Sequence, residues 1–333
     1  MTGDGDVSAV GLGRVCRDIY FVSEGSAARF DSRKTSVRYA GEQLGGSVPA
    51  IIEVLATQGI RSRQVAGIGT QAWAEKFVLD GLARKNLELI RVDVNRTPES
   101  AVMLRQDLTL AEIAVEAEEA SLSLITAPDV SNVALPKQPG AFVYDTRHAE
   151  AAYALARRAR REGLVTFADP GTLGGIPDRR EATLRALGEA HIVFAAANTL
   201  EMMAEDSTAM SITKDLLSRD TEIVISTRSD GGCDVYGRSE QASLQPIDVR
   251  PVGSSLGAGD LCRGFTLAAI MESVTRAALP PFPSILNAVI TGLAAAAWRI
   301  EDPNLFPSVP AWETLQPYLH RAQVANGSAP KGP

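Results

Sequence analysis

The sequence predicts an α/β fold: a doubly wound, mostly parallel sheet with helices on both faces, plus a small second unit of β-strands. From residue 141 onward, short apolar runs alternate with amphipathic helical patterns, which is typical of parallel strands connected by crossover helices. Two earlier segments, 18–44 and 97–119, have strand-like patterns without intervening helices. These segments indicate a small antiparallel appendage.

The composition supports a globular protein and excludes several functional classes. Of the 333 residues, 45% are hydrophobic and 22% charged, and the formal net charge is −7. The densest basic cluster, 157–161, continues a helical pattern and predicts a solvated helix face, so we expect no nucleic-acid partner. No run of 18 apolar residues is present, and the three cysteines are widely spaced. We therefore expect a cytoplasmic protein with no membrane partner and no structural zinc site.

Taken in order, the first half of the chain contains short strands and two helices. The run 64–68 ends in a Gly-Thr turn, and 110–115 contains Glu and Ala that strands seldom favour. The predicted strands are 7–10, 64–68, 89–94, 100–104 and 110–115, and the predicted helices are 48–58 and 72–85.

In the second half, the strands and helices follow one another regularly. Strands are predicted at 142–144, 164–168, 191–195 and 222–226, and helices at 149–161, 181–187, 200–205, 212–217, 259–271 and 284–298. The main domain then comprises 1–17, 45–96 and 120–315, and the small β unit comprises 18–44 and 97–119. Residues 316–333 form a tail, which we expect to be partly disordered.

Polar residues follow several of the predicted strands. Ligands of doubly wound sheets bind beyond the carboxyl ends of the strands. In this arrangement Asp18, Asp169, Asn198, Thr227 and Asp260 come to one edge of the sheet. The sequence therefore predicts a single active site at that edge.

The segment Gly257-Ala258-Gly259-Asp260 precedes a helical pattern. Small residues there permit a tight turn, and the free N–H groups of a helix start attract an anion. Asp260 would place a general base within about one turn of that anion site. The alternative interpretation is a Gly-rich turn with Asp260 as an ordinary helix-start residue.

With these motifs, the chain resembles the ribokinase-like (PfkB) family of carbohydrate kinases over residues 7 to 300. The segment 256–260, followed by Gly264 and Phe265, resembles the family's GAGD signature. The resemblance implies that Gly257, Ala258 and Gly259 form an anion hole. It also implies that Asp260 takes the proton from a substrate hydroxyl as that hydroxyl attacks the γ-phosphate of ATP.

Further site residues follow from the same resemblance. Asn198 and Glu201 match the N-x-x-E element that helps hold Mg²⁺, largely through water. The loop Thr227, Ser229 and Gly232 resembles the nucleotide-binding T-x-G-x-x-G loop, and Asn287 resembles an Asn near the adenine. The substrate-binding residues implied are Asp18, Gly45 and Gly46, and the segments 18–44 and 97–119 would be the family's lid. A homodimer through the lid strands is implied by analogy.

The departures from the family pattern fall mostly on the substrate side. Ala50 and Cys16 stand where relatives have Asn, and Thr70-Gln71 stand where the family often has Asp-Asp. Fewer amides mean fewer hydrogen bonds to a polyol, which argues against ribose. Ser254 replaces an Asp, so the sequence leaves open whether the enzyme uses the monovalent cation that activates some relatives.

Three arginines fall in segments that border the expected pocket: Arg14, Arg17 and Arg105. If one points inward, the substrate carries a carboxylate, phosphate or sulfonate; otherwise they are surface residues. Arg14 is the best candidate, because on a strand it shares side-chain parity with Asp18.

The sequence leaves three functions open. The first is ATP- and Mg²⁺-dependent phosphoryl transfer to a hydroxyl of a sugar or sugar-like small molecule. The second is a nucleoside kinase on the same scaffold. The third is a non-catalytic sensor or scaffold, which is suggested by the substitutions at Ala50, Thr70, Gln71, Ser229 and Ser254. The exact substrate does not follow from the sequence.

Overall fold

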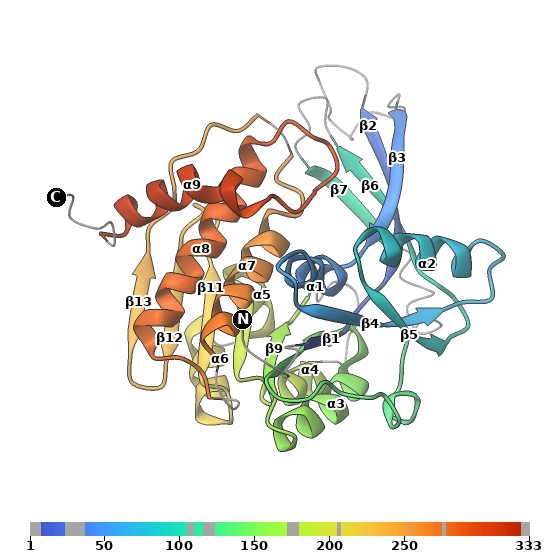
Figure 1. Cartoon of the computed structure of the whole chain (residues 1–333), viewed down its shortest axis with the longest axis horizontal. Coiled ribbons are helices and arrows are strands. Elements are labelled where there is room, and N and C mark those ends of the chain that lie inside the picture. The colour runs from blue at the N-terminus through green and yellow to red at the C-terminus, as the bar shows by residue number, and fades with distance from the viewer. Residues whose placement is uncertain are drawn as a thin grey trace.

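A nine-stranded sheet forms the centre of the protein, with strand order β13-β12-β11-β10-β9-β8-β1-β4-β5 (Figure 1). The computed structural model describes residues 8–23, 37–104, 110–115, 124–171, 180–204, 208–252, 254–274 and 278–327. The strands are β1 (Ser8–Leu12), β4 (Arg61–Ile68), β5 (Glu88–Asp93), β8 (Gly140–Asp145), β9 (Val165–Asp169), β10 (Ile192–Ala196), β11 (Ile223–Thr227), β12 (Cys233–Gly237) and β13 (Gln241–Leu244). From β5 to β11 all neighbours in the sheet run parallel. The predicted doubly wound fold is thereby confirmed.

The hairpin β12–β13 extends the sheet with two antiparallel strands that the sequence did not predict. Along β12, Cys233 and Val235 are buried while Asp234 and Tyr236 are half-buried. This alternation is the signature of a strand with one solvated face. Over five residues it is too short to stand out from a loop.

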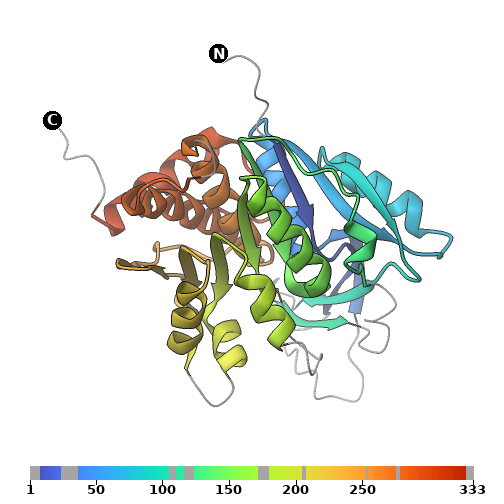
Figure 2. The same ribbon diagram turned by 90° about the horizontal axis from the view of Figure 1, so that it is seen from below.

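Helices cover both faces of the sheet (Figure 2). Successive side chains of a strand point to opposite faces of the sheet, so Val143 and Phe142 of β8 belong to different apolar clusters. Burying an aromatic or branched side chain contributes about 1.5–3 kcal/mol. One face carries α1 (Ser47–Thr57), α2 (Ala74–Arg84), α7 (Ala258–Ser273), α8 (Phe282–Glu301) and, outside them, α9 (Trp312–Ala325). The other carries α3 (Ala149–Arg161), α4 (Arg180–Leu187), α5 (Ala197–Ala204), α6 (Ala209–Ser218) and the short turns η2 (Pro128–Val130) and η3 (Thr146–His148).

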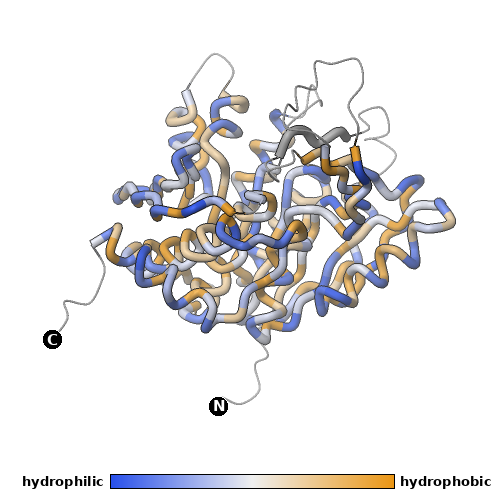
Figure 3. Tube along the Cα trace, turned by 90° about the horizontal axis from the view of Figure 1, so that it is seen from above, coloured by the Kyte–Doolittle hydropathy of each residue, from blue (hydrophilic) through white to orange (hydrophobic). Residues whose placement is uncertain are grey.

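Apolar and hydrophilic residues alternate along the outer helical turns (Figure 3), as expected for helices that bury one face. Helix α8 is more apolar than this and is long enough to cross a membrane by length and composition. It packs between α7 and α9, and 61% of its most apolar window is buried inside the protein. These contacts are those of a core helix.

A separate four-stranded sheet lies beside the main one, in the order β3-β2-β6-β7. Its strands are β2 (Cys16–Ser23), β3 (Val37–Gly45), β6 (Glu99–Leu104) and β7 (Leu110–Val115). The expectation of a purely antiparallel unit was wrong for one pair, because β2 and β6 are parallel. Strand β2 follows β1 and β6 follows β5, so both leave parallel strands of the main sheet in the same direction.

The predicted tail begins inside α9, which continues to Ala325. The Asn326 side chain then accepts a 2.7 Å hydrogen bond from Gln245 N, and Arg321 pairs with Glu301 at 3.2 Å. A helix with its own apolar face therefore occupies most of the segment that we expected to be partly disordered. Residues 328–333 lie outside the described part of the chain.

The chain changes its direction of travel across the sheet at β1. It passes from β1 to β4 and β5, and then returns to β8 on the other side of β1. The carboxyl ends of β1 and β8 therefore form the switch point at which ligands of such sheets bind. Leu12 and Tyr144 are register partners at this edge.

Candidate active site

The first turn of α7, predicted to bind an anion, begins with a glycine in a left-handed conformation. Gly257 caps the helix in the left-handed region, with φ 80° and ψ −5°, and a Cβ there would lie 2.8 Å from Pro307 Cβ. The Ala258 N–H donates to Ser255 O at 3.1 Å. Among the described residues, the N–H groups of Gly257, Gly259 and Asp260 donate to no backbone carbonyl, which leaves three donors without a main-chain acceptor at the positive end of the helix. Of the three predicted anion-hole residues, Ala258 alone uses its N–H within the turn.

Asp260 stands in this turn with its side chain one-quarter exposed. Its Oδ1 accepts a 2.6 Å hydrogen bond from Ser47 Oγ and lies 3.5 Å from Arg263 Nη1. Burial raises the pKa of Asp260, while Arg263 and the Ser47 hydrogen bond oppose that rise. A carboxylate whose pKa is raised accepts a proton more readily near neutral pH.

Asp169, at the end of β9, is joined to Asp260 through two residues. Ser47 Oγ lies 2.8 Å from Asp169 Oδ2, and Arg263 Nε lies 3.4 Å from the same oxygen. Burial lowers the pKa of Arg263, but Asp169 and Asp260 together outweigh it and raise that pKa. A cation thus lies between two carboxylates that would otherwise repel each other.

Sequence reasoning assigned no role to Ser47 or Arg263. The signals were local in both cases: Ser47 directly follows the glycine pair at the start of α1, and Arg263 lies one helical turn after Asp260. Neither position in the sequence reveals that the side chain contacts both Asp169 and Asp260 in the folded protein.

Asp18 lies within β2, between Gln43 of β3 and Ser100 of β6. The expectation that it follows a strand of the main sheet was wrong, because β1 ends at Leu12 and the chain has already entered the small sheet. Burial raises the pKa of Asp18, and its Oδ1 accepts a 3.1 Å hydrogen bond from the Cys16 thiol.

Gly45 and Gly46 are both needed at the start of α1. A Cβ at Gly45 would overlap the Asp18 carboxylate, and a Cβ at Gly46 would overlap Arg14 O. Gly46 also adopts a φ of 115°, which other residues rarely accept. The predicted pair therefore brings the backbone against Asp18.

A pocket lies between Asp18 and Asp260, so the two carboxylates predicted for substrate and base face the same space. Burial raises the pKa of the Cys16 thiol beside it, which keeps the thiol protonated as a donor to Asp18. The other lining residues are Tyr20, Gln43, Leu44, Gly45, Gly46, Ala50, Glu53, Lys85, Leu256, Gly257, Leu261, Pro307, Ser308 and Val309.

The three arginines considered for an anionic substrate behave differently. Arg14 Nη2 donates to Ser100 Oγ at 2.5 Å. Arg17 pairs with Glu42 and Glu99 at 2.5 and 3.2 Å. Arg105 lies outside the described residues. Neither Arg14 nor Arg17 is among the residues that line the pocket.

Asp145, at the end of β8, marks the switch point and was missed from the sequence. Its two oxygens accept hydrogen bonds of 2.9 Å from Arg14 N and Arg147 N. Burial raises its pKa to about 6, and it is the register partner of Asp169. The signal available was its position after a predicted strand.

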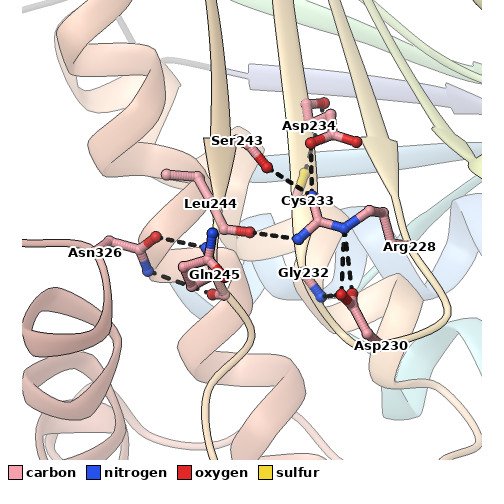
Figure 4. Close-up of polar contacts among 9 residues, drawn as sticks. All are labelled: Arg228, Asp230, Gly232, Cys233, Asp234, Ser243, Leu244, Gln245 and Asn326. Atoms are coloured by element: carbon pink, nitrogen blue, oxygen red, sulfur yellow. Dashed lines mark hydrogen bonds and ion pairs between the residues drawn. The ribbon is translucent and has the colours of Figure 1, made fainter.

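The turn after β11, predicted to bind nucleotide, is held by Arg228 (Figure 4). Its guanidinium donates to Asp234 Oδ1 at 2.6 Å and to Leu244 O at 3.0 Å. A Cβ at Gly232 would overlap this guanidinium, which explains the glycine. Thr227 ends β11 and Ser229 is exposed in the turn.

The residues predicted to hold metal lie on the neighbouring strand–helix connection. Asn198 and Glu201 are exposed, one turn apart on α5, and Ala196 at the end of β10 is the register partner of Thr227. Asn287 is exposed on α8, and no described contact joins its side chain to the turn after β11. The structure thus brings Asn198 and Thr227 to adjacent strand ends, as predicted.

Comparison with known proteins accords with this geometry. The family described as pfkB family carbohydrate kinase matches residues 8–312. No curated protein sequence matches the chain significantly.

Several solved structures share the fold. A carbohydrate kinase from Agrobacterium tumefaciens has 20% identity and a TM-score of 0.71, covering 95% of this chain and 98% of its own. A fructokinase with bound ATP from Xylella fastidiosa has 16% identity and a TM-score of 0.75, with coverages of 93% and 98%. A fructokinase double mutant from Vibrio cholerae O395, in fructose-, ADP- and potassium-bound form, has 15% identity and a TM-score of 0.74, with coverages of 95% and 100%. These identities show the fold alone, whereas the family match extends over most of the sequence, and we conclude that the chain belongs to the pfkB family of carbohydrate kinases.

Proposed function

We propose that the protein transfers the γ-phosphoryl group of ATP to a hydroxyl of a sugar or sugar-like small molecule, with Asp260 as the general base. The observation that carries this proposal is the position of Asp260. It lines the pocket together with Asp18 and stands in the helix turn whose N–H groups have no described main-chain acceptor. A base beside an anion cradle is what phosphoryl transfer to an alcohol requires.

The chain offers groups that fit ATP and magnesium. The free N–H groups at the start of α7 suit the charge on the transferring phosphoryl group. Asn198 and Glu201 present oxygen ligands one helical turn apart, and both are exposed, which suits an ion that keeps several waters. Bound Mg²⁺ would neutralise phosphate charge. The chain's own part is to position the acceptor hydroxyl at Asp260 and to take its proton there.

The charges of the pocket favour a neutral acceptor over an anionic one. Asp18, Glu53 and Asp260 contribute three carboxylates. Among the lining residues that the structure describes, Lys85 is the one cation, and its ammonium is already paired with Glu53. Arg263 is likewise already paired with Asp260, so a carboxylate or phosphate on the acceptor would find no unpaired cation among the described lining residues in a partly desolvated site.

The small sheet supports the role of a lid. Tyr20 and Gln43, which belong to it, line the pocket and share a 2.6 Å hydrogen bond. Closure over the acceptor would exclude water that could otherwise accept the phosphoryl group. Strand β3 is at an edge of this sheet and exposes Tyr39, so the homodimer implied by analogy would use that edge.

The test is phosphoryl transfer by Asp260→Asn on a panel of neutral sugars, sugar acids and nucleosides, measured as ADP release. We expect a loss of about 10²- to 10⁴-fold, the usual contribution of a general base, with Mg-ATP binding retained. Asp93→Asn, at an exposed carboxylate on β5, is the matched control and should keep full activity. Unchanged turnover by a folded Asp260→Asn variant would exclude Asp260 as the base. Failure of the wild-type enzyme on every panel member, with Mg-ATP bound, would favour the sensor or scaffold.

A further inference from the structure

Arg299 is the largest side chain that is fully buried in the described part of the protein. It belongs to the last turn of α8. Its guanidinium donates to four main-chain carbonyls: Leu256 O at 2.9 Å, Asn304 O at 3.0 Å, Leu305 O at 3.1 Å and Asp302 O at 3.4 Å.

These carbonyls belong to two loops that meet at the site. Leu256 immediately precedes Gly257, the cap of the anion-binding turn. Leu305 leads to Pro307, which lines the pocket together with Gly257 and limits the space beside it. Arg299 therefore joins the turn that contains Gly257 to the loop that carries Pro307, and both of these residues line the pocket.

Main-chain carbonyls that converge on one point from two loops form a binding site for a cation, because each oxygen carries partial negative charge and needs a partner when buried. Here the positive charge belongs to the protein. The Asp302 carboxylate lies 3.5 Å from Arg299 Nη1. An arginine keeps its charge at neutral pH even when buried.

Ser254 provides a second observation against a metal cation at this junction. It stands where the resemblance expects an Asp whose presence accompanies monovalent-cation activation. Ser254 is fully buried, and its hydroxyl accepts a 3.1 Å hydrogen bond from Leu256 N. The position is neutral, and the carbonyl of the residue it contacts is already bonded to Arg299. A metal cation at this junction would find no carboxylate at 254, and the four described carbonyls that converge there already accept from Arg299.

We propose that Arg299 is a built-in cation that takes the place of a bound monovalent metal ion, holding the anion-binding turn in position so that this enzyme needs no such ion. The inference rests on the proposed kinase function. Arg299 is a positioning residue, since it acts through Leu256 and Gly257 rather than by touching the substrate. The V. cholerae fructokinase described with potassium provides the contrast.

The first test uses the wild-type protein. Activity and melting temperature are measured in KCl, NaCl and tetramethylammonium chloride at equal ionic strength. We expect the three salts to give the same kcat within about twofold, because the carbonyls are already satisfied. A kcat in KCl that is about tenfold or more higher than in tetramethylammonium chloride would overturn the proposal. Because the ionic strength is equal, general screening of charges would not explain such a difference.

The second test removes the built-in cation. Arg299→Ala should lower kcat by about 10²-fold, the effect of losing an oxyanion-stabilising arrangement, and should lower the melting temperature. Both should recover in K⁺, or in low-millimolar guanidinium, more than in tetramethylammonium. Arg321→Ala, which removes an arginine that bonds Glu301 near the same helix end, is the control and should show no salt-specific recovery. A folded Arg299→Ala variant with full activity in tetramethylammonium would refute the proposal.

The proposal remains testable if a variant does not fold or if no acceptor is phosphorylated. If Arg299→Ala does not fold, Arg299→Lys retains the charge with fewer donors, and the wild-type salt series still decides. If no acceptor is phosphorylated at all, the melting temperatures and Mg-ATP affinities in the same salts provide the answer. The failure of the kinase assignment is thereby separated from that of the built-in cation.

Discussion

The Ser47 hydroxyl lies 2.6 Å from Asp260 Oδ1 and 2.8 Å from Asp169 Oδ2. A hydroxyl has a single proton, so at any moment it donates to only one of these carboxylates. Asp169 adds to the rise in the pKa of Asp260 that burial causes, and the Ser47 hydrogen bond opposes it. Ser47 therefore adjusts the proton affinity of the proposed base.

Ser47→Ala should move the acid limb of the kcat–pH profile to higher pH. Asp260 must be ionised to act as a base, and the hydrogen bond from Ser47 favours the ionised form, so its loss raises the pKa further. At neutral pH we expect a rate loss of about 2- to 10-fold, since one hydrogen bond contributes about 0.5–1.5 kcal/mol. The measurement is kcat against pH for both enzymes. Ser131→Ala, at an exposed hydroxyl that bonds Pro128 O, should leave the profile unchanged, and an unshifted limb in Ser47→Ala would contradict the role of Ser47.

Gly45→Ala should weaken acceptor binding and leave ATP binding intact. The new Cβ would displace the Asp18 carboxylate, and a misplacement of this kind costs about 10²-fold in kcat/KM for the acceptor. Steady-state kinetics with each substrate varied in turn would separate the two effects. Gly237→Ala, in strand β12, is the control, because an added Cβ there would lie 3.3 Å from its nearest neighbour, a Phe282 ring carbon, and would not displace a carboxylate. Equal rises in both KM values would argue against a specific role of Gly45.

Arg228→Ala should raise the KM for ATP by about tenfold, because it removes several hydrogen bonds that hold the turn after β11. Binding of the acceptor should change little, since Arg228 contacts only the β11–β13 region in the described structure. Isothermal titration with a nonhydrolysable ATP analogue would measure the affinity. Arg238→Ala on the same hairpin, whose guanidinium bonds Arg219 O, is the matched control. An unaltered affinity in Arg228→Ala would separate this turn from the nucleotide site.

Asp145→Asn should flatten the dependence of stability on pH. Burial raises the pKa of Asp145 from 3.8 to about 6, so the folded state holds this proton more tightly than the unfolded state. Its contribution to stability is complete below about pH 4, where both states are protonated. That contribution is lost as the pH rises through about 6.

Urea unfolding at pH 4 and pH 7 tests this prediction. The free energy of unfolding of the wild type should contain a component that falls over this interval, and Asp145→Asn should lack it. The variant should also be less stable overall, because one amide cannot accept from both Arg14 N and Arg147 N. An identical pH slope in variant and wild type would contradict the assignment.

The fold class and the reaction class followed from local patterns. Apolar periodicity distinguishes strands from helices over a few residues, which is why α3 was predicted with its observed bounds, Ala149–Arg161. The Gly257–Asp260 turn is likewise local, since φ at Gly257 and the start of α7 depend on neighbouring residues. The hairpin β12–β13 escaped prediction because its alternation spans so few residues.

The sequence by itself determined the strands of the sheet, the Gly257–Gly259 turn and the Asp260 carboxylate beside it, because short-range conformational preferences specify each of them. Only the tertiary structure decided which distant side chains bond to these parts and so set their positions and their proton affinities. Ser47 reaches Asp260 across 213 residues of sequence, Arg299 reaches Leu256 across 43, and Lys85 meets Glu53 across 32. Hydrogen bonds and ion pairs between distant segments depend on how strands and helices pack, and no spacing along the chain encodes them. For this reason the proposed reaction could be inferred from local motifs and their resemblance to a family, while the proposed independence from a monovalent cation depends on the contacts of Arg299 with its carbonyls.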